Sequence, residues 1–338
     1  MALPPPSERK KKKIHLSERI CCSLPTGFIT SPIYLSHETG DWHPETPGRL
    51  LAIHDYIKKT GIASFLRFVT PIPHPEISEW ITSIHHPGYY QSLHHKIPTQ
   101  GLSNLDPDTP ISPLSVTAAE MAVSGVLTAI DEVMAGRLQN AFCAIRPPGH
   151  HAELNRAMGF CLFNNVAIGA RYLQKQYGLT RIFIIDWDVH HGNGTQNSFY
   201  ADPTVFYFSA HQYPFYPGTG SVKERGVDYG EGFTVNCPLP AGAGDRKFLN
   251  LFNKTLANAV AGFKPDFILI SAGFDAHRDD PLANLQVTDE GFSEITTIVK
   301  GLAGTYCGGR IVSCLEGGYD LSALASAVGK HLTVLAGM

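Results

Sequence analysis

The stretch IFIIDWDVHHGNG, residues 182–194, joins a buried-strand pattern to a dense group of polar side chains. Its first four residues are apolar, as expected of a strand covered on both faces of a parallel sheet. Its last nine residues hold two aspartates, two histidines, one asparagine and two glycines. Ligands of parallel α/β sheets bind beyond the carboxyl ends of the strands. The stretch therefore predicts a rigid strand that delivers polar groups to a binding site.

Short apolar runs alternate with longer amphipathic runs over most of the remaining sequence. We expect strands at residues 27–30, 68–71, 141–145, 182–186, 205–209, 234–238, 266–271 and 310–315. We expect helices at residues 49–59, 114–135, 165–177, 246–261, 288–303 and 321–335. This alternation favours the α/β class, with a parallel sheet covered by helices on both faces. The sequence contains no internal repeat, and its amino-acid composition does not change along the predicted strands and helices. We therefore expect a single folded domain.

The composition argues against several classes of protein, among them nucleic-acid-binding, membrane-spanning and disulfide-rich proteins. Of 338 residues, 43% are hydrophobic and 17% charged, and the net charge of −3 gives no general case for nucleic-acid or membrane binding. The seven cysteines form no CxxC motif, which favours reduced thiols over a disulfide framework. No apolar run approaches the roughly 18 residues of a membrane span, and no signal peptide pattern opens the sequence. We expect a soluble cytoplasmic protein; the sequence predicts no oligomeric state.

Residues 1–13, MALPPPSERKKKK, differ from the rest of the chain. Prolines followed by a basic run cannot build a core, so we expect a disordered arm ahead of a folded domain at 14–338. Most such runs are solvated tails. The alternative is a nuclear targeting signal or a nucleic-acid contact, which would place the protein in the nucleus.

Five predicted strand ends carry titratable or metal-binding groups. Because the carboxyl ends of parallel strands meet at one edge of the sheet, we expect these groups to converge on one site. They are His150 and His151 in RPPGHHAE, the polar group of residues 186–194, His211, Asp275 in AGFDAH, and Tyr319 in EGGYD.

A metal site is the first hypothesis for this convergence. Asp188 and His190 are two residues apart, so both side chains point the same way in an extended segment. With the distant carboxylate of Asp275 they form a three-ligand set, which is typical of catalytic zinc with an open fourth position. Asp186 and His191 are competing ligand candidates. The alternative is a hydrogen-bond network in which carboxylates satisfy buried histidines.

The adjacent histidines His150 and His151 favour catalysis over simple binding. Two imidazoles beside a metal suggest acid–base work on water. Each needs an acceptor that fixes its tautomer, and Asp186 and Asn193 are available. The carboxylate would raise the pKa of its histidine, whereas the neutral amide would leave its histidine closer to neutrality. The pairs at 85–86 and 94–95 lie in an amphipathic helical region, and we do not expect them to be ligands.

The motifs described above, taken together, resemble those of a known family. The sequence is similar to the zinc-dependent histone deacetylase and acetylpolyamine amidohydrolase superfamily from about residue 32 to residue 334, and closer to class II and bacterial members than to class I. The motifs that carry the resemblance are RPPGHHAELNRAMGFCLFNNVAIGARY (146–172), DWDVHHGNGTQNSFY (186–200), YPGTG (216–220), SAGFDAHRDDPLANL (271–285) and LEGGYDLSAL (315–324). The resemblance implies the arginase–deacetylase fold with an eight-stranded parallel sheet.

The resemblance also implies the zinc ligands and the acid–base groups. Zinc would be held by Asp188, His190 and Asp275, which decides against His191.

Asp186 would orient His150, and Asn193, where many members have aspartate, would face His151. In the family the second histidine is the general base and then the general acid, while the first gives electrostatic support. Tyr319 would hydrogen-bond the scissile carbonyl.

Further positions are implied to contact the substrate or the product. Gly159, Phe160 and Tyr216 match the walls of the acyl-lysine tunnel, and Arg49 matches an arginine of the acetate-release cavity. Asp108 lies near a position where some deacetylases grip a peptide N–H. Leu282 stands where polyamine-specific members can carry a glutamate.

Monovalent cations, usually potassium, are implied as well. One site would use Asp186, Asp188, His190, Ser209 and Ala210, largely through backbone carbonyls. A second site would use Phe199, Asp202, Val205 and Phe233.

The function implied is hydrolysis of acyl-lysine side-chain amides in acetylated proteins or peptides to free lysine and acetate. The alternatives are an acetylpolyamine amidohydrolase, a binuclear manganese ureohydrolase on the same fold, and a non-catalytic acyl-lysine binder. Leucine at 282 favours acyl-lysine over acetylpolyamine, because an acidic residue there would attract a second ammonium group.

Overall fold

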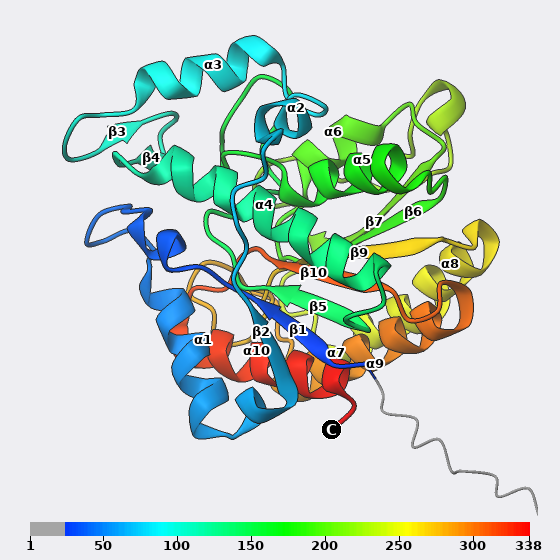
Figure 1. Cartoon of the computed structure of the whole chain (residues 1–338). Helices are drawn as coiled ribbons and strands as arrows, with labels where there is room; N and C mark the ends of the chain where they lie inside the picture. Colours follow the sequence, from blue (N-terminus) through cyan, green and yellow to red (C-terminus); the bar gives the residue numbers. More distant parts are fainter. Residues whose placement is uncertain (1–23) are drawn as a thin grey trace, which may run out of the picture.

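Eight parallel strands form the central sheet of the computed structural model, in the order β2-β1-β5-β10-β9-β6-β7-β8. The structure describes residues 24–338, so the arm expected at 1–13 lies outside the described residues. The predicted α/β class with an eight-stranded parallel sheet is confirmed. Figure 1 shows the sheet between two layers of helices.

The strands follow the apolar runs of the sequence. Their bounds are β1 Thr26–Ile29, β2 Leu66–Val69, β5 Asn140–Cys143, β6 Ile182–Asp186, β7 Val205–Gln212, β8 Thr234–Leu239, β9 Phe267–Ala272 and β10 Ile311–Leu315. Strand β2 lies two residues earlier than expected, since its pairing with β1 begins at Leu66 and Thr26. A separate antiparallel pair, β3 (Ser103–Asn104) and β4 (Pro110–Ile111), was not predicted.

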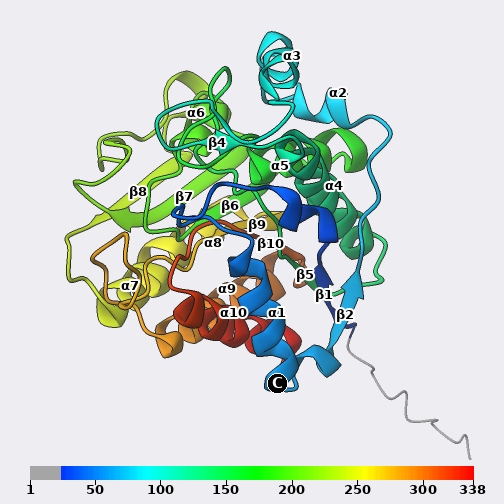
Figure 2. The same ribbon diagram turned by 90° about the vertical axis from the view of Figure 1, so that its left-hand side faces the viewer.

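Helices cover both faces of the sheet. Figure 1 and Figure 2 place α1, α9 and α10 on one face and α4 and α5 on the other. The helical bounds are α1 Gly48–Lys59, α2 Ile77–Ile81, α3 Pro87–Lys96, α4 Ser115–Met134, α5 Asn165–Tyr177, α6 Asn193–Phe199, α7 Asp245–Asn250, α8 Ala257–Phe263, α9 Asp289–Tyr306 and α10 Leu321–Ala336. Short 3-10 helices lie at η1 Pro32–Ser36, η2 Ile62–Phe65 and η3 Asp228–Gly230.

One expected helix is interrupted. The sequence predicted a continuous helix at 246–261, but a π-helical segment, η4 (Leu251–Leu256), separates α7 from α8. Its Phe252 and Leu256 are buried, so the wider turn keeps the apolar side chains directed into the core.

Burial explains why the central strands read as unbroken apolar runs. Every residue of β6, β9 and β10 is buried, because helices cover both faces. Within residues 24–338 no helix is long and apolar enough to cross a membrane. The carboxyl ends of these central strands carry the polar groups described next.

Candidate active site

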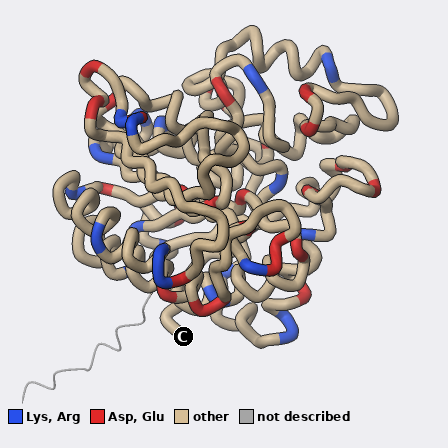
Figure 3. Tube along the Cα trace, turned by 180° about the vertical axis from the view of Figure 1, so that it is seen from behind, with Lys and Arg blue, Asp and Glu red and all other residues tan. Residues whose placement is uncertain are grey.

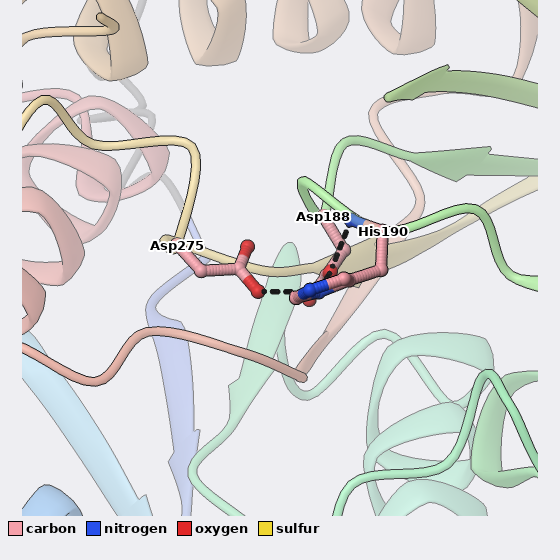
Figure 4. A group of neighbouring side chains, drawn as sticks. All are labelled: Asp188, His190 and Asp275. Carbon is pink, nitrogen blue, oxygen red and sulfur yellow. Dashed lines mark hydrogen bonds and ion pairs between the residues drawn. The ribbon is translucent and has the colours of Figure 1, made fainter. Parts of the chain in front are cut away.

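Asp188, His190 and Asp275 form one cluster at the carboxyl ends of β6 and β9. One ligand atom from each lies within 4.8 Å of the others. His190 Nδ1 is 3.1 Å from Asp188 Oδ1 and 3.1 Å from Asp275 Oδ2 (Figure 4). Both aspartates are buried, and the His190 side chain is 13% exposed. A nitrogen and two carboxylates held this close can bind a divalent cation.

Backbone groups fix the second oxygen of each carboxylate. Asp188 Oδ2 accepts a hydrogen bond from the N–H of Gly317 at 2.8 Å, and Asp275 Oδ1 accepts one from Val189 at 2.8 Å. Gly317 also packs so closely that a Cβ there would collide with the Asp275 carboxylate. Gly317, the first glycine of the EGGYD motif, is therefore needed for the close approach of the backbone to the Asp188 and Asp275 carboxylates.

The charges of the cluster favour a bound cation. Burial, followed by the neighbouring charge of Asp188, raises the pKa of Asp275 to about 7. The ionised Asp188, whose pKa is lowered by His150 and His190 despite burial, thus disfavours the ionised form of Asp275. A divalent cation would remove this conflict, and one imidazole with two carboxylates is a donor set that fits zinc.

His191 is turned away from the cluster. Its Nδ1 lies 2.7 Å from Thr219 Oγ1 and its Nε2 lies 3.0 Å from Gln196 Oε1. Both ring nitrogens are therefore engaged elsewhere, and Asp186 faces His150 instead. Of the four ligand candidates in residues 186–191, the structure brings only Asp188 and His190 to Asp275.

His150 is held as a cation by carboxylates. Its Nδ1 lies 3.1 Å from Asp186 Oδ2, which also accepts a hydrogen bond from the Tyr207 hydroxyl at 3.0 Å. Burial opposes the charge of His150, but Asp188 and Asp186 outweigh burial and raise its pKa to about 10. Tyr207 was not predicted as a site residue, because its position in the apolar run of β7 made it look like core.

His151 has a neutral partner instead. Its Nδ1 donates to Asn193 Oδ1 at 2.7 Å, and its ring centroid is 4.1 Å from that of His150. Burial, together with the nearby charges of His150 and His190, lowers the pKa of His151 well below its usual value. The Asn193 amide in turn donates to Glu153 Oε1 at 2.8 Å. The two adjacent histidines therefore differ in protonation.

Glu316 is a buried site residue that the sequence did not reveal. Its carboxylate accepts from the backbone N–H groups of Gly149 at 2.6 Å and His150 at 3.2 Å, and from Ser271 Oγ at 3.1 Å. Burial raises its pKa to about 7. Glu316 thus fastens the turn that carries the histidine pair to the end of β10.

A cavity of about 230 Å³ opens onto the cluster. Phe215, which was not predicted, stacks on His190 at a centroid distance of 5.3 Å. Tyr216 is 39% exposed and meets the ring of His151 edge-on at 5.2 Å. The lining residues are Asp108, His151, Gly159, Phe160, His190, Phe215, Tyr216, Leu282 and Tyr319.

Tyr319 lines this cavity together with His151. Its backbone N–H donates to Asp280 Oδ2 at 2.7 Å, and its ring packs edge-on against Phe160 at 5.7 Å. Burial raises the pKa of Tyr319 well above its usual value, so the hydroxyl stays protonated and can donate a hydrogen bond. Asp280 was not predicted as a site residue.

Arg49 lies behind Tyr319, not in the wall of the cavity. Its Cζ is 5.1 Å from the centre of the Tyr319 ring, and its Nε donates to the carbonyl of Gly318 at 2.7 Å. Nη1 donates to Glu45 Oε1 at 3.0 Å. Arg49 and Glu45 are both fully buried. This ion pair therefore holds Arg49 against Gly318 and the Tyr319 ring.

At the mouth of the cavity, Asp108 and Leu282 are the rim residues. Asp108 Oδ1 accepts a hydrogen bond from the N–H of Gly159 at 3.2 Å. Leu282 is 37% exposed, and its N–H donates to Asp280 Oδ1 at 2.9 Å. The same carboxylate of Asp280 therefore fixes both Leu282 and Tyr319.

The residues implied for potassium fall at two places near β7. At the first, Ser209 pairs with Asp186 across β7 and β6, and Ala210 follows it. At the second, Asp202 donates its backbone N–H to the Phe199 carbonyl at 3.0 Å, and the Phe233 carbonyl accepts from Tyr207. The Asp202 carboxylate is already paired at both oxygens, with Arg171 at 2.7 Å and with the Thr204 N–H at 2.9 Å. Val205 begins β7 beside this second group.

Comparison with known proteins assigns the family. The model of the histone deacetylase domain matches residues 43–335. The chain belongs to the histone deacetylase family.

Relatives and a solved structure agree with this assignment. A probable deacetylase of Archaeoglobus fulgidus is 40% identical over 296 residues, covering 88% of this chain and 82% of that protein. Histone deacetylase 10, chloroplastic, of Oryza sativa subsp. japonica is 39% identical over 332 residues, covering 94% of this chain and 74% of the relative. The crystal structure of the HDA15 HD domain superposes with a TM-score of 0.88 at 34% identity, covering 93% of this chain and 88% of that one. The resemblance inferred from the motifs is thus confirmed, and the protein is a histone deacetylase-family hydrolase.

Proposed function

We propose that this protein is a zinc-dependent deacetylase that hydrolyses acyl-lysine side-chain amides of proteins or peptides to free lysine and acetate. One observation carries the proposal: His190 of the three-residue cluster, the neutral His151 and the protonated Tyr319 line the same cavity. A base, a hydrogen-bond donor and a cation site around one point are the groups that amide hydrolysis needs.

Asp188, His190 and Asp275 would hold the zinc ion. When bound, zinc would supply Lewis-acid polarisation of the scissile carbonyl and of water. The backbone hydrogen bonds from Gly317 and Val189 keep both carboxylates in place for this role.

His151 would carry the proton. Because its Nδ1–H is donated to Asn193, Nε2 holds the free lone pair. Its lowered pKa keeps the ring neutral, as a general base must be. His151 takes a proton as water attacks the carbonyl carbon, then passes it to the leaving lysine nitrogen.

Tyr319 and His150 would stabilise the developing negative charge. The Tyr319 hydroxyl donates to the carbonyl oxygen as the amide becomes tetrahedral, a contribution of roughly 3–4 kcal/mol for a well-placed donor. His150, whose pKa is raised by Asp188 and Asp186 despite burial, adds a positive charge beside the reacting centre.

The walls favour an acyl-lysine chain. Phe160, Phe215 and Tyr216 offer aromatic surface to a neutral acyl-aminoalkyl group, whose entry requires no charge to be desolvated. Leu282 at the rim gives an apolar contact and no carboxylate for the second ammonium of a polyamine. We propose a structural role for potassium at the two places near β7, as the resemblance to the family implies; the Phe199 and Phe233 carbonyls there also accept backbone hydrogen bonds.

A kinetic panel tests the proposal. Acetate release and kcat/KM would be measured for an acetyl-lysine peptide, N8-acetylspermidine and longer acyl-lysine peptides, with metal content determined on the same preparation. We expect the acetyl-lysine peptide to be hydrolysed best. A tenfold or greater preference for N8-acetylspermidine would show that Leu282 does not set the substrate class. Two metal ions per chain would favour a ureohydrolase, and no acetate from any substrate would favour a binding protein.

A further inference from the structure

An exposed tryptophan stands beside the mouth of the cavity. Residues 38–44, which we call the rim loop, follow η1, and Trp42 in this loop is 98% exposed. The rim loop faces the β3–β4 pair (Figure 1), and a groove of about 390 Å³ lies between them. Its walls include Asp41, Trp42, Pro44, Leu102, Pro107 and Asp108. The groove therefore combines apolar surface with carboxylates.

The groove adjoins the catalytic cavity. Asp108 lines both. His43 of the rim loop packs edge-on against Phe160 of the cavity at 4.6 Å, and its Nε2 lies 3.1 Å from the Asp108 carbonyl oxygen. The groove therefore lies within reach of the residues next to an acyl-lysine that enters the cavity.

The charge of the groove has one sign. The rim loop contains Glu38 and Asp41, and the β3–β4 segment, residues 101–111, contains Asp106 and Asp108. Neither segment contains a lysine or an arginine. The rim loop projects at the right of Figure 3 and shows red but no blue. Arg156 approaches Asp106 at 3.4 Å but leaves Asp41 and Asp108 unneutralised.

We propose that this groove binds a lysine or arginine side chain next to the acyl-lysine of a peptide substrate. The inference rests on the proposed function and specifies its substrate class. A cation above the face of a tryptophan is attracted by the ring, and the carboxylate of Asp41 adds to this attraction. An exposed apolar ring beside acids is favourable for a long cationic chain, which packs its methylene groups and keeps its charge in water.

The test compares peptides that differ at one position. Acetyl-lysine peptides carry arginine, its neutral isostere citrulline, or glutamate at the residues before and after the acetyl-lysine. kcat and KM are measured for the zinc-loaded enzyme and for the Trp42→Ala and Asp41→Asn variants. Phe65→Ala and Asp55→Asn serve as matched controls, since both residues are exposed and lie outside the groove.

For the unmodified enzyme we expect kcat/KM to be about three- to tenfold higher for the arginine peptide than for the citrulline peptide at one of the two positions. The preference should arise in KM, weaken with added salt, and shrink toward one in Trp42→Ala and Asp41→Asn. The control variants should keep the full ratio.

Three results would overturn the inference while leaving the proposed function in place. They are equal kcat/KM for arginine and citrulline peptides at both positions, an arginine preference that survives both groove substitutions, and a groove-dependent preference for N8-acetylspermidine over every peptide. Failure of the proposed function is a different result, namely no hydrolysis of any acetyl-lysine peptide by the zinc-loaded enzyme.

Discussion

The side-chain amide of Asn193 is oriented by Glu153, whose Oε1 accepts a hydrogen bond from Asn193 Nδ2 at 2.8 Å. An ionised carboxylate can only accept, so the amide must turn its NH₂ toward Glu153 and its oxygen toward His151. The oxygen then fixes the hydrogen of His151 on Nδ1 and leaves Nε2 free. Glu153 also accepts from Asn197 at 3.0 Å, which holds the carboxylate itself in place.

We therefore expect Glu153→Ala to lower kcat by about 10- to 100-fold, a range typical for loss of a supporting hydrogen bond behind a functional histidine. Glu153→Gln should retain most of the activity, because its amide oxygen can still accept from Asn193. Steady-state kinetics on an acetyl-lysine peptide checks this. The nitrogen shifts of labelled His151 should show a loss of the single tautomer in the alanine variant only. An alanine variant with unchanged kcat would contradict the role of Glu153.

Asp275→Ala removes one of the two carboxylates of the cluster. We expect the purified variant to lose both bound zinc and activity, because the remaining two ligands are too few for tight binding. Metal analysis after dialysis is the measurement. Asp279→Ala, an exposed aspartate in the same loop, should keep both. Stoichiometric zinc in the Asp275 variant would refute the assignment of the ligands.

Tyr319→Phe deletes one hydroxyl and keeps the packing of the ring against Phe160. We expect kcat to fall by about 100- to 1,000-fold with little change in KM, since the hydroxyl donates most strongly to the charge that develops in the transition state. Tyr229→Phe is the matched control, because Tyr229 is exposed. If kcat stayed unchanged in Tyr319→Phe, another donor would have to hold the carbonyl oxygen.

Glu45 supports the site through its buried pairs with Arg146 and Arg49, at 2.5 Å and 3.0 Å. Glu45→Gln leaves two buried guanidinium groups without their counter-charge, and we expect a loss of about 3–5 kcal/mol in the free energy of unfolding. Denaturant titration measures this loss. Glu294→Gln, on the exposed face of α9, should change stability little.

The pH dependence of that loss has a definite sign. Burial opposes the charge of Glu45, but Arg146 and Arg49 outweigh it and hold its pKa well below the usual value. The stabilisation is therefore fully present above the unfolded-state pKa of about 4.3 and declines as the pH falls toward the folded-state pKa. The difference between the two proteins should be constant from about pH 5 to 8 and shrink at lower pH. A constant difference down to about pH 2 would contradict this origin.

Much of the fold could be predicted because the sheet is buried on both faces. Strand β6 was predicted with its observed bounds, since Ile182–Asp186 is an apolar run that ends at a charged residue. The π-helical segment at Leu251–Leu256 could not be predicted, because one widened turn barely changes the spacing of apolar residues.

The site was predictable where its residues cluster in sequence and hidden where they do not. Asp188 and His190 stand in one short stretch, but Glu316 reaches the Gly149 turn from 167 residues away. Tyr207 lies in the apolar run of β7, and nothing local shows that its hydroxyl meets Asp186. The residues alone left His190 and His191 as alternatives; the resemblance to the family favoured His190, and in the structure Thr219 engages His191.

Strands β6 and β9, which lead to Asp188 and Asp275, pair directly with each other in the interior of the sheet. The edge strands β2 and β8 do not pair with β6 or β9. Neither edge strand lines the cavity. Transient fraying at an edge, the lowest-energy opening of a sheet, therefore leaves the two carboxylates together. Amide hydrogens of Ile184 and Leu269, which pair in register, should exchange with deuterium only when the whole domain opens. The two carboxylates therefore lie within the cooperative folding unit and should stay together until the whole domain unfolds.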